Sequence, residues 1–321
     1  MMLLLSSATT KVRAFSDISS ITLSSIQFRI DNCNSKTSSS STNTKFVDFV
    51  VDDTIIGHLN PALAAHLSSR FSYVFQSNPK SNSFTINPSI PPTCEDRTNA
   101  IRPILRKLRE ENVISGWRDE DLAVVTSFDD FNDNPLFLLE RAAMPHFGCR
   151  SYGVHMNGFI EDPSTGKPSH LWVGRRSATK QTSPGMLDHL VAGGQPFGIT
   201  PFENMVKECA EEASIPEKIA KNVVCGGFVS YKYHTAGQVK QDTLFCYDLK
   251  VPLDFVPTPC DGEVDSFTLM SIDDVMAHFA NDHPDPFKPN CCLVIIDFLV
   301  RKGILSAGMK GYERIITSLK Q

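Results

Sequence analysis

The spacing of apolar residues changes near residue 150 and divides the chain into two parts. In the first part, apolar residues recur every three or four positions at 61–71 and 97–111, which predicts two amphipathic helices. A Ser-, Asn- and Pro-rich stretch at 76–92 predicts a loop. Short apolar runs predict strands at residues 46–51, 122–125 and 136–138. We therefore expect a small α+β N-terminal domain over residues 46–145.

In the second part, predicted strands alternate with predicted helices. The strands are expected at residues 152–160, 171–173, 223–229, 244–249 and 266–269. The helices are expected at residues 201–213, 272–279, 290–302 and 312–319. Interleaved strands and helices are typical of a layered α/β domain. We expect such a domain over residues 146–321.

Residues 1–45 differ from the rest in composition. They contain 18 Ser or Thr residues, five basic residues and two acidic ones. This composition is typical of an organellar transit peptide, and a plain disordered tail would share it. Because hydroxylated residues far outnumber basic ones, we expect import into the chloroplast (plastid), with the mitochondrion as the alternative.

The overall composition excludes several classes of protein. The formal net charge of −5 provides no basic excess for binding nucleic acid, and no apolar run is long enough to span a membrane. The nine cysteines form no Cys-x-x-Cys pair and no Cys/His quartet, so their spacing suggests no zinc site. We expect free, mostly buried thiols, with Cys291 and Cys292 packed on a helix.

The residues that carry chemistry surround the helix expected at 201–213. Thr200 before Pro201 is a typical helix start, and Glu203 completes a capping box. Glu208, Glu211 and Glu212 follow at i, i+3 and i+4, so their carboxylates share one side of the helix. An apolar stripe should dock this helix on a sheet, through Phe202, Met205, Val206, Cys209 and Ala213.

Two interpretations of the three carboxylates are open. Acidic helix faces are often merely solvated. Alternatively, the cluster binds a hard divalent cation, which prefers carboxylate oxygen. The preceding glycine-rich loop at 193–201 favours the second interpretation, because the backbone of Gly193 and Gly194 can closely approach a phosphate.

Residues 193–215 resemble the box of the Nudix hydrolases, G-x5-E-x7-R-E-U-x-E-E-x-G-U, where U is aliphatic. Gly193, Glu208, Glu211, Glu212 and Ile215 match its positions. Four positions depart from it, namely Ile199, Lys207, Cys209 and Ser214. Lys207 keeps the charge of the usual arginine but not its fork, and we expect Glu203 to be able to pair with it.

Further segments are similar to one branch of that family, the plant plastid enzymes and the Nudix part attached to fungal thiamin pyrophosphokinases. These segments lie at residues 172–177, 184–188, 192–194, 261–264 and 287–291. The resemblance implies a Nudix-type α/β/α sandwich with a mixed sheet, preceded by the small N-terminal domain. It also implies a small-molecule diphosphate substrate. Some members of the branch convert damaged thiamin diphosphates, the oxo- and oxy-forms, to the monophosphates.

The resemblance also implies roles for individual residues. Glu208, Glu211 and Glu212 would hold Mg²⁺ or Mn²⁺. Glu263 is a candidate additional ligand or general base, and a simple surface acid after an Asp-Gly turn is the alternative. Three cations could neutralise the diphosphate, namely Arg175, Arg176 and Lys180. Three rings could stack on the substrate or pack as core or rim residues, namely Tyr231, Tyr233 and His234.

Two alternative functions stay open. One is hydrolysis of a nucleotide sugar or a dinucleotide diphosphate. The other is a non-catalytic Nudix-like module that binds a diphosphate without cleaving it, which the departures at Ile199 and Lys207 favour. The sequence does not set the oligomeric state.

Overall fold

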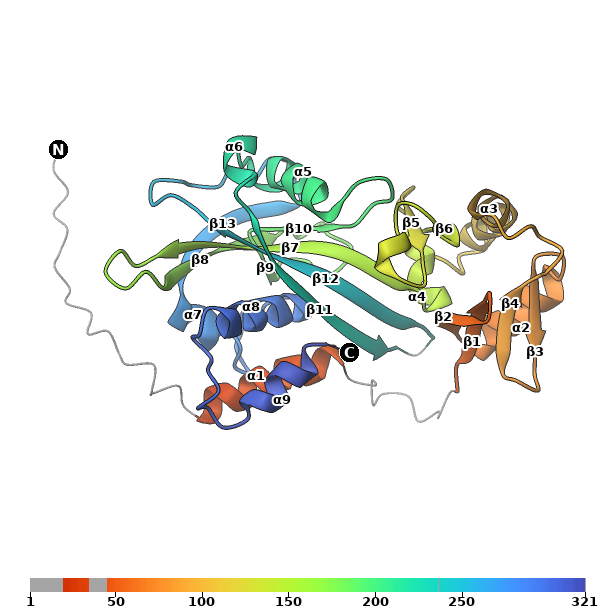
Figure 1. Cartoon of the computed structure of the whole chain (residues 1–321), viewed down its shortest axis with the longest axis horizontal. Coiled ribbons are helices and arrows are strands. Elements are labelled where there is room, and N and C mark those ends of the chain that lie inside the picture. Colours follow the sequence, from red (N-terminus) through yellow and green to blue (C-terminus); the bar gives the residue numbers. More distant parts are fainter. Residues whose placement is uncertain (1–19, 35–44, 236, 321) are drawn as a thin grey trace.

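A mixed sheet of seven strands forms the centre of the C-terminal part (Figure 1). The computed structural model describes residues 20–34, 45–235 and 237–320. The main strand order is β11-β12-β7-β8-β13, with β10 paired to β7 and β9 to β8. Among the described strands of this sheet, β7 and β12 pair in parallel and the other pairs are antiparallel. The strands are β7 (Arg150–Glu161), β8 (Pro168–Arg176), β9 (Leu187–Asp188), β10 (Val191–Gly194), β11 (Val224–His234), β12 (Val239–Lys250) and β13 (Val264–Ser271).

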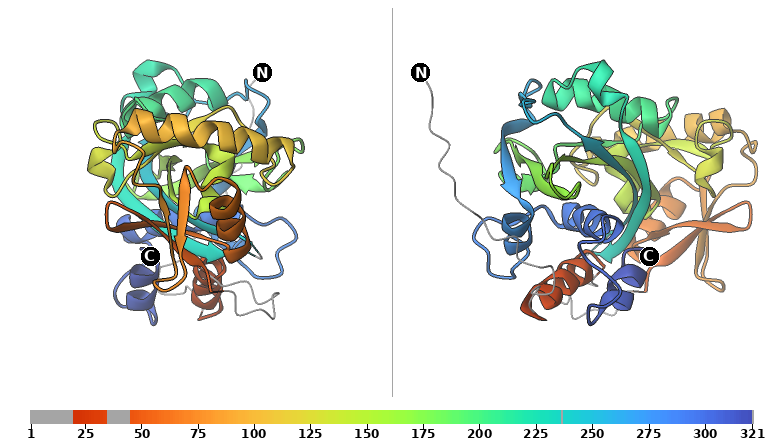
Figure 2. Two further views of the ribbon diagram at one scale, coloured as in Figure 1. Left: turned by 90° about the vertical axis from the view of Figure 1, so that its right-hand side faces the viewer. Right: turned by 60° about the vertical axis from the view of Figure 1, so that its left-hand side comes forward.

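Helices cover both faces of this sheet (Figures 1 and 2). On one face lie α5 (Pro201–Ala213) and α6 (Glu217–Ala220). On the other lie α7 (Ile272–Ala277) and α8 (Pro289–Arg301), with α1 (Ser20–Cys33) and α9 (Tyr312–Ser318) outside them. Each face has its own apolar core, one around Met205 and Cys209 and the other around Leu293 and Phe298. The prediction of an α/β/α sandwich with a mixed sheet is confirmed.

Helix α1 lies within the segment that the sequence interpretation placed in a transit peptide or disordered tail. For Ser20–Cys33 the expectation of disorder is wrong. Ile26, Ile30 and Cys33 are spaced by four and three residues, so they form one apolar stripe, which is buried against α8 and α9. Arg29 adds hydrogen bonds to main-chain carbonyls after α7, with 2.9 Å to that of Phe279. The abundant Ser residues hid this stripe, and the rest of residues 1–45, apart from Asn34 and Lys45, lies outside the described residues.

The N-terminal part is a second body beside the sandwich (Figure 2). Its four-stranded sheet has the order β2-β1-β4-β3, and a two-stranded sheet pairs β5 with β6. The strands are β1 (Val47–Val51), β2 (Thr54–Leu59), β3 (Phe75–Asn78), β4 (Ser83–Ile86), β5 (Asp121–Val124) and β6 (Phe137–Glu140). The helices are α2 (Pro61–Arg70), α3 (Cys94–Glu110), η2 (Phe128–Asp130), η3 (Arg141–Ala143) and α4 (Met144–Phe147).

The expected loop at 76–92 is partly wrong, because it contains β4 and most of β3. In β4 the apolar Phe84 and Ile86 are buried, while the intervening polar residues are partly exposed. This alternation with period two is a strand signal that the Ser- and Asn-rich composition concealed.

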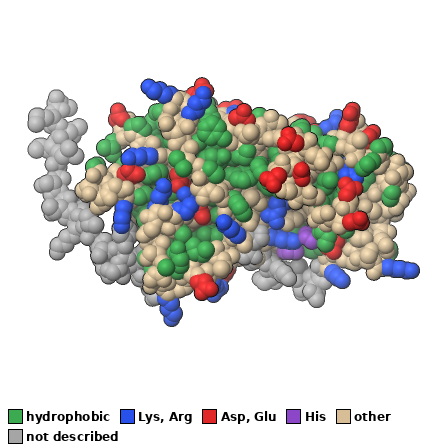
Figure 3. Space-filling model, viewed as in Figure 1, with side chains coloured by type: hydrophobic (Ala, Val, Ile, Leu, Met, Phe, Trp, Pro, Cys, Tyr) green, Lys and Arg blue, Asp and Glu red, His purple; other side chains and the backbone are tan. Residues whose placement is uncertain are grey.

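The molecular surface carries both signs of charge. On the face shown in Figure 3, acidic and basic side chains are interspersed, in keeping with the small net charge of −5. Within the described ranges, each helix is either too short or too polar to cross a lipid bilayer.

Candidate functional site

Helix α5 begins as the sequence predicts. The Thr200 hydroxyl accepts the main-chain N–H of Glu203 at 3.2 Å, and the Glu203 carboxylate accepts the N–H of Thr200 at 2.8 Å. The predicted capping box is therefore confirmed. Because Glu203 is used in this way, it does not pair with Lys207, which corrects that expectation. Phe202, expected in the apolar stripe, is 41% exposed, whereas the polar Asn204 on the same helix is buried.

The two glycines expected in a phosphate-binding loop lie instead in strand β10. Gly193 pairs with Val154 and Gly194 with Gly153 on β7. A Cβ atom on Gly193 would lie 2.3 Å from Cδ of Glu208, and one on Gly194 would lie 3.2 Å from the Arg141 guanidinium. Because both residues lack a side chain, they leave room for the side chains of Glu208 and Arg141.

Glu208 and Glu212 face this strand, one helical turn apart. Glu212 is 7% exposed, and one of its carboxylate oxygens accepts the N–H of Ala192 at 2.8 Å. Lys207 lies on the same helix, with its Nζ 3.2 Å from Glu208 and 2.7 Å from Glu211. Glu211 itself is exposed. The helix thus presents two carboxylates to β10 and a third, at its outer edge, to Lys207.

The loop before β13 brings two further carboxylates to the same place. Oxygen atoms of Glu212, Asp261 and Glu263 lie within 4.8 Å of one another. Glu263 also forms an ion pair with Lys180, which follows β8. The structure therefore brings together Glu208, Glu212 and Glu263, which lie 55 residues apart at the extremes of the sequence.

The surroundings shift the pKa values of these carboxyl groups in different directions. Burial raises the pKa of Glu208, and the charge of Lys207 only partly opposes it. Burial also raises the pKa of Glu212 well above its ordinary value, and the nearby Asp188 and Glu208 add to this rise. For Glu263 the hydrogen bond and charge of Lys180 outweigh burial and lower the pKa. The site thus combines two carboxyl groups that resist ionisation with one that ionises readily.

The arginines expected at the diphosphate lie elsewhere, which corrects that expectation. Arg176 is buried and contacts Asp188 at 2.6 Å. Arg175 forms a two-pronged ion pair with Asp285, at 2.5 and 2.6 Å. Both guanidinium groups are engaged by carboxylates that are not part of the cluster around Glu212.

The aromatic residues considered for ring stacking belong to the core or its rim. Tyr231 is 2% exposed, and its hydroxyl contacts Asp242. Tyr233 stacks on Tyr231 with ring centres 6.1 Å apart, and His234 packs edge-on against Phe46 at 5.2 Å. The structure favours the packing alternative for all three.

Sequence reasoning missed two residues at this site. Asp261 was seen only as part of a turn, although it stands two residues before Glu263 and could have been paired with it by spacing. Arg141 follows β6 in the N-terminal part, contacts Glu120 at 2.7 Å and lies over Gly194. No local pattern links residue 141 to residue 194, since only the docking of the two bodies brings them together.

The chemistry of these donors fits a hard divalent cation. Carboxylate oxygens are the ligands that Mg²⁺ and Mn²⁺ prefer. The acidic neighbours of Glu212 raise its pKa, so a cation here would offset their repulsion. Glu208, Glu212 and Asp261 are the residues that would hold it, with Glu263 beside them.

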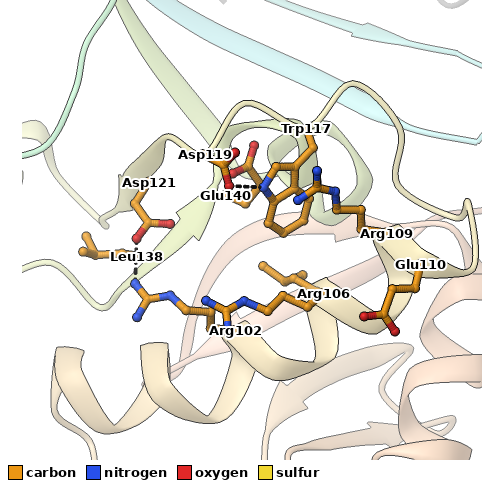
Figure 4. Close-up of a pocket in the computed structure, with 10 residues that line it drawn as sticks. Arg102, Arg106, Arg109, Glu110, Trp117, Asp119, Asp121, Leu138 and Glu140 are labelled. Carbon is orange, nitrogen blue, oxygen red and sulfur yellow. Dashed lines mark hydrogen bonds and ion pairs between the residues drawn. The ribbon is translucent and has the colours of Figure 1, made fainter.

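A separate pocket of about 600 Å³ lies in the N-terminal part (Figure 4). Arg102 in this pocket pairs with Asp121 at 2.6 Å, and the Arg109 guanidinium lies over the Trp117 ring. Several charged side chains of α3 contribute to the lining of this pocket. Acidic and basic side chains both contribute, so no single sign of ligand charge is favoured.

Comparison with known proteins identifies one matching family model and two similar plant proteins among others. Residues 26–151 match a family described as a domain of unknown function, DUF4743. Nudix hydrolase 24, chloroplastic, and Nudix hydrolase 20, chloroplastic, both of Arabidopsis thaliana, are each 40% identical to it. Each alignment covers 86% of this chain and 73% of the relative.

One similar solved structure is the Nudix domain of Shewanella oneidensis NrtR complexed with ADP-ribose. It is 12% identical, with a TM-score of 0.36, and the match covers 55% of this chain and 99% of that one.

Proposed function

The chain belongs to the Nudix hydrolase family, and on that premise we propose that it is a metal-dependent pyrophosphohydrolase that cleaves the diphosphate bond of a small molecule. The observation that carries the proposal is the meeting of Glu212, Asp261 and Glu263, with Glu208 next to them beside Gly193 of β10. Two of these carboxylates come from the box helix and two from a loop about 50 residues later. Such convergence is not expected of a merely solvated acidic helix face.

We propose that the bound cation is Mg²⁺ or Mn²⁺. Held there, such a cation would supply positive charge to stabilise the diphosphate and would activate a water molecule as the nucleophile. Glu208 and Glu212 serve as its ligands, with Asp261 as a further donor. Lys207 holds Glu208 and Glu211 in place through its two ion pairs. Glu211 is the third glutamate of the box and would be an outer ligand, because it lies at the exposed edge of α5.

The remaining residues act on the proton and on the substrate charge. Glu263 is the candidate general base, because its carboxylate lies beside those of Glu212 and Asp261, where a water next to the cation would be within reach. Arg141, which lies over Gly194, and Lys180, which pairs with Glu263, are the cations that would neutralise the diphosphate. Arg141 thus replaces Arg175 and Arg176 in this role.

The finer substrate proposal is damaged thiamin diphosphate, in its oxo- or oxy-form, with the monophosphate as product. It is supported by the resemblance to the Nudix part attached to thiamin pyrophosphokinases, at residues 172–177 and 287–291 among others. Nucleotide sugars and dinucleotide diphosphates are the alternatives.

We also propose that the protein works in the plastid and that a transit peptide occupies the residues before α1. The names of both Arabidopsis relatives include "chloroplastic". The Ser-rich, acid-poor composition of residues 1–19 supports the same location. A fluorescent fusion of residues 1–50 that stays in the cytosol would contradict this proposal.

The activity is tested by a product assay on the full chain with Mg²⁺ or Mn²⁺. The substrates are thiamin diphosphate, its oxo- and oxy-analogues, ADP-ribose, NADH and nucleoside triphosphates. Glu212→Gln should abolish metal-dependent turnover while leaving the fold intact. Glu217→Gln, which changes an exposed glutamate paired with Lys221 on α6, is the matched control and should keep full activity.

Three outcomes are distinct. Turnover lost in Glu212→Gln but kept in Glu217→Gln supports the proposal. Full activity in Glu212→Gln removes this helix from the mechanism. Binding of a diphosphate without release of product, across the whole panel, supports the non-catalytic module instead.

A further inference from the structure

Four polar side chains meet in the apolar layer between the sheet and α8. They come from three separate elements, since His155 lies on β7, Asp188 and His189 lie at the end of β9, and Cys291 lies on α8. All four are deeply buried, with exposures of 4% for His155, 6% for Asp188, 4% for His189 and 0% for Cys291. One donor atom from each lies within 4.8 Å of those of the other three.

We propose that these four side chains bind a transition metal ion, with Zn²⁺ as the natural occupant, in a second site distinct from the carboxylate cluster. Two imidazoles, a thiolate and a carboxylate are a donor set suited to zinc. A closed site with four protein ligands and no exposed side is typical of structural rather than catalytic zinc.

The distances fit this occupant. Nδ1 of His155 lies 3.1 Å from Nδ1 of His189, and the two ring planes are nearly perpendicular. Two nitrogen ligands of one tetrahedral zinc are roughly 3.3 Å apart, because the Zn–N bond is about 2.0–2.1 Å long. Nδ1 of His189 lies 3.7 Å from Oδ1 of Asp188. The 2.7 Å separation between Sγ of Cys291 and this oxygen would have to open, to roughly 3.5 Å.

The ion pairs of Asp188 orient one of its carboxylate oxygens toward the cluster. Arg176 and Lys288 both approach Oδ2 of Asp188, at 2.6 and 3.5 Å, so Oδ1 is the oxygen that faces the sulfur and the imidazoles. An ion pair of this kind on the outer oxygen would orient the carboxylate toward the metal.

Binding also balances chemically. The Cys291 thiol gives its proton to solvent and the resulting thiolate binds the ion, while both imidazoles bind as neutral ligands. The ion would then fasten α8 to β7 and β9. His155 stands opposite Ala192 in the β7–β10 pairing, and the N–H of Ala192 binds Glu212. The fastening therefore lies directly beneath the carboxylate cluster.

Cobalt substitution of the full chain tests this site. After treatment with a chelator, titration with Co²⁺ should give one equivalent with thiolate-to-cobalt charge-transfer absorption and the strong visible bands of tetrahedral cobalt. Cys291→Ser should lose the charge-transfer absorption. Cys292→Ser, which changes the neighbouring buried thiol on the same helix, should keep it. Glu212→Gln should also keep it, which separates this site from the one proposed for catalysis.

A second measurement, made on the wild-type protein, tests the site even where a variant does not fold. Wild-type protein loaded with zinc should contain one equivalent in the absence of Mg²⁺ and Mn²⁺ and have a higher Tm than chelator-treated protein. Folded wild-type protein that binds neither zinc nor cobalt stoichiometrically would overturn the proposal. Unchanged charge-transfer absorption in Cys291→Ser would do the same.

Discussion

Replacing Gly193 with alanine tests whether strand β10 sets the position of Glu208. The added Cβ would lie 2.3 Å from Cδ and 2.5 Å from Oε1 of that glutamate. Normal contacts between carbon atoms are about 3.5–4.0 Å, so the overlap exceeds what small shifts can relieve. The glycine has no left-handed φ, so alanine suits its backbone and the carboxylate must move instead.

The energetic consequence falls on the site rather than on the fold. Turning Glu208 away from its rotamer costs about 0.5–1.5 kcal/mol. Displacing a metal ligand through its support should lower metal affinity and kcat/KM by about 10–100-fold, which corresponds to about 1.4–2.7 kcal/mol. Mn²⁺ binding by calorimetry, steady-state kinetics and Tm would measure the three effects separately.

The adjacent glycine provides the matched control. A Cβ on Gly194 would lie 3.2 Å from the end of the Arg141 side chain, which can shift. Gly194→Ala should therefore keep wild-type Mn²⁺ affinity and change KM more than kcat. Wild-type metal affinity and turnover in Gly193→Ala would refute the assignment of Glu208 as a ligand.

Three further predictions concern stability. Ile30→Ala should lower the free energy of unfolding by about 2–5 kcal/mol, because Ile30 is fully buried, and denaturant titration would reveal a smaller effect if α1 were dispensable. Ser214→Gly should raise Tm, because Ser214 has a left-handed φ of 53°, and a fall in Tm would show that its hydrogen bond to Thr258 matters more. Burial lowers the pKa of His146 below its ordinary value of 6.5, so the neutral form stabilises the fold above that value and this contribution is lost as the pH falls through the folded-state pKa. Tm measured between pH 5 and 7.5 should fall less steeply on the acid side in His146→Gln.

Local signals predicted the elements well because their patterns are strong. Helix α5 has its stated bounds because Thr200, Pro201 and Glu203 specify its start, and Ser214 ends it in a left-handed conformation. The mixed sheet and its covering helices follow from the alternation of strands and helices after residue 150. Strand β10 was missed because Gly193 and Gly194 lack the side chains that usually mark a strand.

The candidate site was only partly predictable. The glutamates on one helix follow from helical spacing, whereas the approach of Glu263 depends on where β13 joins the sheet, which the family resemblance supplied. Asp188 gives the physical reason for the misplaced Arg176, since a buried arginine requires a partner that the sequence does not reveal. The cluster of His155, His189 and Cys291 shows no motif spacing at all, because its members lie 34 and 102 residues apart.

The division between the two bodies at residue 146 remains a proposal. The apolar core of the N-terminal part includes residues from Phe49 to Cys149. Separate expression of residues 46–149 would test whether this part folds alone.

The packing of α1 limits where the transit peptide proposed above can end. Cleavage at residue 45 would remove Ile26 and Ile30, uncover the apolar side of α8 and release the carbonyl groups that Arg29 caps. The mature protein should therefore start ahead of Ser20, so that the leader and the first structural helix are adjacent but separate pieces of sequence. Recombinant versions trimmed to the start of β1 should aggregate, and those starting before α1 should stay in solution.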